Sequence, residues 1–384
     1  MTAPRLADVV ELLDEQYPPA TAESWDAVGL TLGDPDQAVH RVLLAVDPVR
    51  AVVDEAVERA AQLLVTHHPL FLRPVHGFAE STPKGRSAAT LVRAGIGLYT
   101  AHTNADVAID GVNDALAGVL QLLDSRPLVP ATVVEDKLVT FVPTVAVAQV
   151  TRALTDAGAG TIGDYIRCSW SVVGEGSFLP GPDAHPLIGS VGQVERVAEA
   201  RLEVIVPRTL RSAVVRALID AHPYEQVAYD IYERVGSPVV AGHGRVGELA
   251  SPMPLGAFAA RVQRSLPTAP AGVRFAGDPL RSVRRVAVMG GAGDSVFDAA
   301  CAAGADVLVT ADLRHHPVSE LRERSSLAVV DPGHWASEWP WLVRAARRLE
   351  AAVSARGESV ETLVSAVVTD PWTGVVTPDQ RASV

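Results

Sequence analysis

The fold is decided by the stretch LLVTHHPL at residues 63–70. Its first four residues have the apolar character of a strand buried inside a parallel sheet. Two histidines and a proline then end the strand, because proline fixes its own φ, lacks an amide hydrogen and biases the residue before it toward an extended backbone. His67 and His68 are therefore expected at the carboxyl end of a strand, where open α/β sheets bind their ligands.

The two adjacent histidines suit a pair of metal ions better than a single ion. Neighbouring residues of an extended chain point to opposite sides, so one ion would hardly reach both His67 and His68. Two neighbouring ions could each take one imidazole. The alternative is a pair of solvated loop histidines, and the dipeptide alone favours that simpler interpretation.

The residues on either side of this stretch repeat its pattern. Residues 41–46 form an apolar strand that stops at Asp-Pro, residues 49–62 have the composition of a helix, and a further apolar strand at 96–101 ends in HTNAD. A strand, a helix and a strand within about thirty residues are the crossover unit of a parallel sheet. Because successive parallel strands end at the same edge, His102 and Asp106 are expected near the first two histidines, which favours a binding site.

A second set of strands, later in the chain, ends in the same way. Apolar strands are expected at 286–289, 307–310 and 327–330, and the last one ends in DPGHWASE. The residues that follow have a helical pattern, so His334 and Glu338 would share one face of its first turn. The amino end of a helix also favours a carboxylate. The sequence thus predicts a two-part α/β core whose strands end in metal-type ligands.

The middle of the chain has a different order of elements. Strands and helices are expected in the order β-α-β-β-α-β, at residues 138–143, 145–157, 171–173, 201–206, 210–221 and 227–232. That order is typical of a ferredoxin-like α+β domain. His222, in the motif HPYE, is expected to be a loop histidine packed near an aromatic ring, with a metal-binding role as the alternative.

Four segments show no convincing strand pattern and separate these regions. They are interpreted as a turn, a domain boundary, a loop and a linker, at residues 23–30, 125–130, 174–192 and 237–247. The domain boundaries that follow give a first core segment at 1–128, a middle domain at 129–237 and a second core segment at 238–384.

Composition limits the partners and the cellular location. A formal net charge of −12 argues against a general nucleic-acid binder. No apolar run reaches the ~18 residues that a membrane span needs. Cys168 and Cys301 are expected to be two buried thiols, as in a reducing cytosol. The early charges of residues 1–10 leave no signal-peptide hydrophobic region, so a cytoplasmic location is expected.

Four ordered motifs resemble those of the Nif-three-like family of dinuclear-metal-centre hexameric proteins, also called GTP cyclohydrolase I type 2 homologues. They are WDAVGL at 25–30, THHP at 66–69, HTNAD at 102–106 and DPGHWASE at 331–338. The resemblance covers nearly the whole chain. Motifs of the middle region resemble the inserted PII/CutA-like domain of the longer family members, at residues 160–165, 168–170, 174–178 and 222–225.

The resemblance implies a site for two divalent metal ions in each subunit of a homohexamer. By position, the implied metal ligands are His67, His68, Asp106, His334 and Glu338, with Glu338 as the bridge. Three further residues match positions near the metals and are candidates for catalysis: His102, Asp312 and His316. Ala27 and Ala311 stand where the family usually has Asn and Gly. Imidazole and carboxylate ligands suit zinc, iron or manganese.

A two-metal site of this kind suits hydrolysis, because it can supply hydroxide at neutral pH. The family name implies a small-molecule substrate, GTP, whose guanine imidazole ring is opened with release of formate. The sequence offers no independent guanine pocket, and hydrolysis of a phosphate ester is an equal use of the site. The alternative of another class is a ring-shaped metal-binding regulatory or scaffold protein. Five ligands shared by two metals leave open coordination positions, which favours an enzyme.

Overall fold

The chain folds into two compact units of mixed α/β structure. The computed structural model describes residues 2–132, 135–163, 165–234 and 238–376. The first unit combines residues 1–131 with 240–384, and the second comprises residues 132–239. The assignment of residues 129–237 as an inserted PII/CutA-like domain stays a prediction, and its boundary at 235–237 lies outside the described residues.

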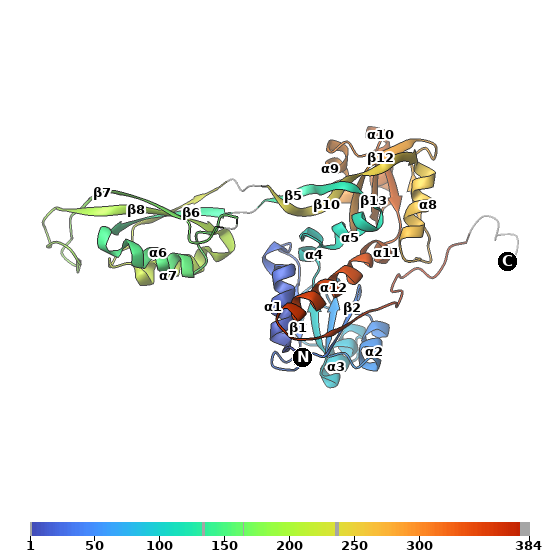
Figure 1. Ribbon diagram of the computed structural model, residues 1–384, viewed down its shortest axis with the longest axis horizontal. Helices are drawn as coiled ribbons and strands as arrows, with labels where there is room; N and C mark the ends of the chain where they lie inside the picture. Colours follow the sequence, from blue (N-terminus) through green and yellow to red (C-terminus); the bar gives the residue numbers. More distant parts are fainter. Residues whose placement is uncertain (1, 133–134, 164, 235–237, 377–384) are drawn as a thin grey trace. The chain divides into compact units, whose positions relative to one another are not determined.

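The first unit contains a five-stranded, mostly parallel sheet (Figure 1). Its order is β1 (Gly29–Leu32), β4 (Gly97–Thr100), β3 (Leu63–Thr66), β2 (Arg41–Ala45) and β15 (Glu361–Val364). The last four strands run parallel, as the buried strand pattern predicts, and β1 joins the edge antiparallel to β4. The prediction of a turn over residues 23–30 was therefore wrong at its end, where β1 begins.

Helices cover both faces of this sheet, which explains its unbroken apolar strands. Leu43 and Leu64 pack toward α2 (Arg50–Glu58) and α3 (Pro83–Ala94). Their neighbours in the strands, Leu44 and Val65, pack on the other face, toward the adjacent helices α1 (Leu6–Gln16) and α12 (Pro340–Ala355) (Figure 1). The carboxyl ends of the parallel strands are buried as well, and the side chains that follow them therefore lie inside the first unit.

A six-stranded sheet forms the other half of the first unit. Its order is β11 (Arg274–Ala276), β14 (Ala328–Asp331), β13 (Val307–Ala311), β12 (Ser282–Ala292), β10 (Pro238–Pro254) and β5 (Leu123–Thr132). The three central strands are parallel and correspond to the predicted ones. Two helices on each face bury it: α5 (Val112–Val119) and α8 (Leu255–Ser265), then α9 (Phe297–Ala302) and α10 (His315–Arg324).

Strands β5 and β10 replace the predicted boundary at 125–130 and the predicted linker at 237–247. The prolines of β5 are tolerated because that strand is at the edge of the sheet. Gly242 of β10 is needed where the two strands approach each other, since a Cβ atom there would overlap with the carbonyl oxygen of Val129. Prolines and glycines therefore mark an edge and a close approach here, and the linker interpretation was wrong.

The second unit is a four-stranded antiparallel sheet with two helices on one face (Figure 1). Its elements follow the predicted β-α-β-β-α-β order: β6 (Glu135–Pro143), α6 (Val147–Asp156), β7 (Ser169–Phe178), β8 (Glu195–Pro207), α7 (Arg211–Ala221) and β9 (Tyr229–Glu233). The sheet order is β7-β8-β6-β9. Strand β7 extends to Phe178, so the loop predicted from residue 174 begins five residues too early. Regular pairing with β8 holds the two glycines of β7 in the strand.

Two features relate to cellular location. Among the described residues, no helix combines the length and the apolar character that crossing a bilayer requires. Cys168 and Cys301 are both free thiols, and each is half-buried rather than buried as predicted.

Candidate metal centre

The candidate site lies where strand ends of the two sheets of the first unit meet. His67 and His68 follow β3 directly. Asp106 lies in α4 (Thr103–Val107), the short helix after β4. Both strands end at the same edge of the five-stranded sheet because they are parallel neighbours.

The six-stranded sheet contributes the other two predicted ligands. His334 and Glu338 are the first and last residues of α11 (His334–Glu338), which follows β14. Their side chains share one face of this single turn, as their spacing predicts, and His334 Nε2 lies 3.0 Å from Glu338 Oε1. The site therefore joins residues from two separate sheets.

Glu338 is the centre of the cluster. Its Oε1 atom lies 3.5 Å from His67 Nε2, and its Oε2 atom lies 3.3 Å from His68 Nε2. Asp106 Oδ1 lies 3.8 Å from the same atom, His67 Nε2. His68 Nε2 and His334 Nε2 are 3.3 Å apart. One carboxylate thus lies among three imidazoles, with each of its oxygens facing a different histidine.

The three imidazoles are oriented by hydrogen bonds from their other ring nitrogens. Each Nδ1 atom lies within hydrogen-bond distance of an oxygen: Ala101 O for His67 (2.9 Å), Asp47 Oδ1 for His68 (2.7 Å) and Asp312 Oδ2 for His334 (2.8 Å). Donation from Nδ1 fixes the tautomer and leaves the Nε2 lone pair for another ligand. Metal-binding histidines are held in this way by carboxylates and carbonyls.

Several buried atoms of the cluster lack a partner, and this tests whether a metal fits. His67 Nε2, Asp106 Oδ1 and Glu338 Oε2 are buried without a hydrogen-bond partner in the described part of the chain. Buried polar atoms are normally paired, so these three require another ligand. Metal bonds of about 2.0–2.2 Å place neighbouring ligand atoms roughly 3.0–3.5 Å apart. The spacing around Glu338 is of this size, and the residues fit a metal ion.

A glycine leaves the space that such an ion needs. Gly291 lies in β12 with a φ of +64°. A Cβ atom at this position would overlap with Glu338 Oε1 and would lie 3.0 Å from His334 Nε2. Any larger residue would therefore fill the side of the cluster that the glycine keeps open.

The charges of the cluster favour a cation. Burial by itself would lower the pKa of His68, but the charge of Glu338 and the hydrogen bond to Asp47 raise that pKa to about 11. Burial would also lower the pKa of His334, but the charge of Glu338 raises that pKa to about 9. Burial would raise the pKa of Glu338, yet the neighbouring imidazoles hold it well below its ordinary value. Without a metal, the imidazoles of His68 and His334 are protonated and positively charged. A divalent ion would displace these protons and supply the positive charge instead.

His102 belongs to the same cluster. Its Nδ1 atom lies 2.8 Å from Asp26 Oδ1, and the other oxygen of Asp26 accepts the Thr103 backbone amide. Although burial opposes the effect, hydrogen bonds from His102 and Thr103 hold the pKa of Asp26 far below its usual range. Among the described residues, two groups bring potential ligand atoms within 4.8 Å of one another: His67, His68 and His102, then His68, His334 and Glu338. The two groups share only His68.

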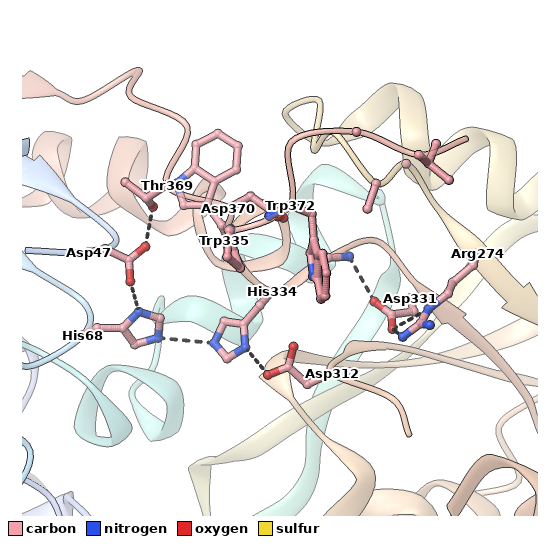
Figure 2. A pocket seen from close by; sticks show the side chains of 16 residues that line it. Asp47, His68, Arg274, Asp312, Asp331, His334, Trp335, Thr369, Asp370 and Trp372 are labelled. Atoms are coloured by element: carbon pink, nitrogen blue, oxygen red, sulfur yellow. Dashed lines mark hydrogen bonds and ion pairs between the residues drawn. The ribbon is translucent and has the colours of Figure 1, made fainter. Parts of the chain in front are cut away.

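A cavity of about 570 Å³ opens beside the cluster. His68 and His334 form one end of it, and the indole of Trp372 and the guanidinium of Arg274 lie toward the other (Figure 2). Arg274 is held by Asp331, whose Oδ2 atom accepts a hydrogen bond of 2.7 Å. The cavity therefore places a single cation within the same space as the histidines.

The structure separates the three candidate catalytic residues. His102 and Asp312 contact the cluster directly, through His67 and His68 in one case and His334 in the other. His316 lies in the first turn of α10 with an exposed side chain stacked on His315, and the described residues show no contact between it and the ligands. Asp312 has a positive φ of 55°, so its tight turn forms although Ala311 precedes it.

Sequence reasoning missed four residues of the site. Asp26, Asp47, Arg274 and Gly291 were not singled out, although Asp26 and Asp47 hold two of the histidines. Asp47 follows an apolar strand, β2, in the same way as the recognised ligands follow theirs. That signal could have found Asp47. Arg274 and Gly291 reach the site only through the packing of distant elements, and no local signal marks them.

Comparison with known proteins identifies the family of the chain. Residues 4–371 match the family described as Duf34/NIF3 (NGG1p interacting factor 3). The "GTP cyclohydrolase 1 type 2 homolog" of Mycobacterium tuberculosis is 50% identical over 370 residues, covering 96% of both chains, and that of Bacillus subtilis is 40% identical over 366 residues, covering 95% of this chain and 97% of the relative. A Bacillus cereus protein related to NIF3 has a similar structure, with a TM-score of 0.76 and 36% identity over 98% of this chain and 100% of that one. The chain belongs to the Duf34/NIF3 family.

Proposed function

We propose that this protein is a hydrolase that depends on a dinuclear metal centre. The observation that carries the proposal is the unpaired set of buried ligand atoms around Glu338, whose neighbours His68 and His334 line a cavity. The proposed ligands are His67, His68, Asp106, His334 and Glu338, with Glu338 between two divalent ions of zinc, iron or manganese. The close relation of His102 to His67 and His68 makes it a further candidate ligand.

The residues of the site would have different roles in such a reaction. Two divalent ions held there would supply an activated water and a Lewis acid. Asp47, Asp312 and the Ala101 carbonyl hold the histidines with their Nε2 atoms inward. Glu338 itself is buried, whereas His68 and His334 line the cavity through which a substrate would approach. His102, whose Nδ1 is held by Asp26, faces the cluster as the candidate for moving a proton.

The substrate is proposed to be a small anionic molecule. The name of the relatives points to GTP and to opening of the guanine imidazole ring with release of formate. A phosphate ester is the second candidate, because Arg274 gives the cavity one guanidinium that could face a phosphate group. The exposed indole of Trp372 forms a flat wall against which a ring could stack. These features support a nucleotide-sized substrate in either reaction.

A ring-shaped metal-binding scaffold is the competing function. Such a protein would hold its metals in closed coordination, whereas the cavity beside His68 and His334 leaves one side of the cluster open. A homohexamer and a cytoplasmic location stay predictions, and neither is needed for the hydrolase proposal.

Elemental mass spectrometry of the purified protein tests the metal centre. We expect about two transition-metal ions per chain and a clear loss in His68→Ala and His334→Ala. His316→Ala is the matched control, because it removes an exposed imidazole outside the cluster and should keep the metal. A wild-type protein that holds no metal after incubation with zinc, manganese or iron would refute the proposal.

Product assays on the metal-loaded protein then separate the reactions. Formate release from GTP and phosphate release from phosphate esters are measured side by side. Arg274→Met should raise KM for the anionic substrate about tenfold with a smaller change in kcat, while Arg356→Met, on the surface beside Glu11, should change neither. A fully loaded protein that forms neither product would favour the scaffold.

A further inference from the structure

Two sequence motifs of the second unit have no part in the metal centre. They are GEGSF at 174–178 and HPYE at 222–225. Although they are far apart in the sequence, both contribute to the walls of one cavity of about 680 Å³ that lies within the second unit. This volume would enclose a small organic molecule.

The cavity lies against the face of the sheet that the helices leave uncovered. Phe141 and Val172 both pair with Arg201 across neighbouring strands, so their side chains are on the same face as the guanidinium. Leu202, the next residue of β8, is on the opposite face and packs in the core with α6 and α7. Residues 180–188 cover the open face with an apolar loop, and the enclosed surface is predominantly apolar.

Tyr224 is fixed in this cavity by His222. The Tyr224 backbone amide donates to His222 Nδ1 at 3.1 Å, so His222 must carry its proton on Nε2, which lies 3.1 Å from the Phe141 carbonyl oxygen. The His222 ring lies 5.2 Å from that of Tyr224, and Phe178 packs on it at 6.2 Å. His222 is thus the structural histidine that the sequence predicts, and its effect is to hold an aromatic wall in place.

The charged residues of the cavity are paired except for one. Glu175 pairs with Arg196, Glu225 accepts the His185 backbone amide, and Arg201 donates to Glu203 at 2.9 Å. Within the described residues, no cationic side chain forms an ion pair with Glu199. Its carboxylate therefore lies in a largely apolar cavity without an ion-pair partner, although Arg201, which shares Glu203 with Lys137, lines the same cavity.

Two further observations place this carboxylate in the cavity. Glu199 lies over Gly176, where a Cβ atom would overlap with it, so the glycine of the first motif makes room for the acid. Tyr224 Oη is buried and has no hydrogen-bond partner in the described part of the chain. Burial and the interaction of the hydroxyl with the adjacent Glu199 carboxylate raise the pKa of Tyr224. The carboxylate and the hydroxyl are thus neighbours in the cavity.

We propose that this cavity binds a small organic cation, an amine with an apolar or aromatic body. Glu199 would pair with the ammonium group, and Tyr224 Oη would accept one of its hydrogen bonds. The rings of Phe178 and Tyr224 would contact the body of the ligand and attract its charge through their π faces. The site is distinct from the metal centre and does not depend on the proposed hydrolysis.

Ligand-observed NMR on the full-length, metal-loaded protein tests this inference. The probes are phenethylammonium and benzyltrimethylammonium, with neutral phenylethanol and anionic phenylacetate as matched compounds of similar shape. We expect both cations to bind more tightly than the other two. Glu199→Gln should weaken the cations about tenfold and leave phenylethanol unchanged, because only the charge is removed.

Asp220→Asn is the control, since it removes a carboxylate from an exposed position on α7 of the same unit. Gly176→Ala is a second test, because its new methyl group would displace Glu199 and should reproduce the loss. Equal binding of cationic, neutral and anionic probes would overturn the proposal. Binding of none of them, with a change in the oligomeric mass of Glu199→Gln, would show instead that a second copy of the chain covers this face.

Discussion

Carboxylates that are not themselves proposed metal ligands fix the orientation and the tautomer of the ligand histidines. Asp312 accepts from His334 Nδ1, so replacing it with Asn removes a charged acceptor and leaves the imidazole free to change its tautomer. We expect Asp312→Asn to weaken metal binding about 10–100-fold without unfolding the protein. Competition with a chromophoric chelator measures the affinity. Asp183→Asn, an exposed change in the second unit, should bind as the wild type does.

Protons compete with metal for the same imidazoles. The pKa values of His68 and His334, about 11 and about 9 without metal, lie above neutrality, so both rings are protonated at neutral pH and must release protons to bind. Metal affinity should therefore rise as the pH rises toward the lower of these values and fall in acid. Titration calorimetry in buffers of different ionisation enthalpy measures the protons released. Binding without proton release would contradict this account.

The size of one side chain decides whether the cluster stays open. Gly291→Ala would place a methyl group against Glu338 and His334 and would also strain a backbone with positive φ. We expect less than half of the wild-type metal content from elemental analysis, as an order-of-magnitude estimate. Gly77→Ala, whose new methyl group meets no atom within 4 Å, should keep all of it.

Strand β10 and helix α5 are joined by a buried ion pair. Arg245 is 2% exposed, and both its Nε and one terminal nitrogen donate to Asp114 at 2.6 and 2.7 Å. Removing one partner leaves a buried charge without compensation, so Asp114→Ala should destabilise the first unit by about 3–5 kcal/mol in chemical denaturation. Asp8→Ala, which breaks an exposed pair with Arg5, should cost about 1 kcal/mol or less.

The parallel strands could be predicted from the sequence, because burial on both faces requires continuous apolar runs such as residues 63–65. The antiparallel edges could not. In β5, pairing with the distant strand β10 overrides the local signal from proline. In β7, pairing with the next strand, β8, overrides the local signal from glycine. Edge strands carry few apolar side chains, so neither the spacing of apolar residues nor the amino-acid composition distinguishes these strands from loops.

The candidate site was predictable to the same extent. Ligand-type residues at strand ends were visible, and the structure brings His67, His68, Asp106, His334 and Glu338 together. Their neighbours were not visible where they depend on distant packing. Gly291 matters only because α11 crosses beside β12, and Arg274 matters only because of the cavity that it lines.

At the scale of the whole molecule, the proposed metal ligands come from both sheets of the first unit. None of these ligands lies in the second unit. Metal binding should therefore stabilise the first unit alone, by mass action on its folded state. We expect a chelator to increase amide hydrogen exchange in β3, β4 and α11 and to leave β6 and β8 unchanged. Hydrogen-exchange mass spectrometry measures both. Equal loosening of the second unit would show that the two units are coupled.

The two histidines that face each other across the centre, His68 and His334, are 266 residues apart in the chain. A ribosome that adds about 5–20 residues per second needs on the order of ten seconds or more to make the second one after the first. During that time the nascent chain carries the His67-His68 pair without its partners. All five residues can hold metal together only after synthesis has passed Glu338, so an assembled centre shows that both parts of the first unit have been made and have come together.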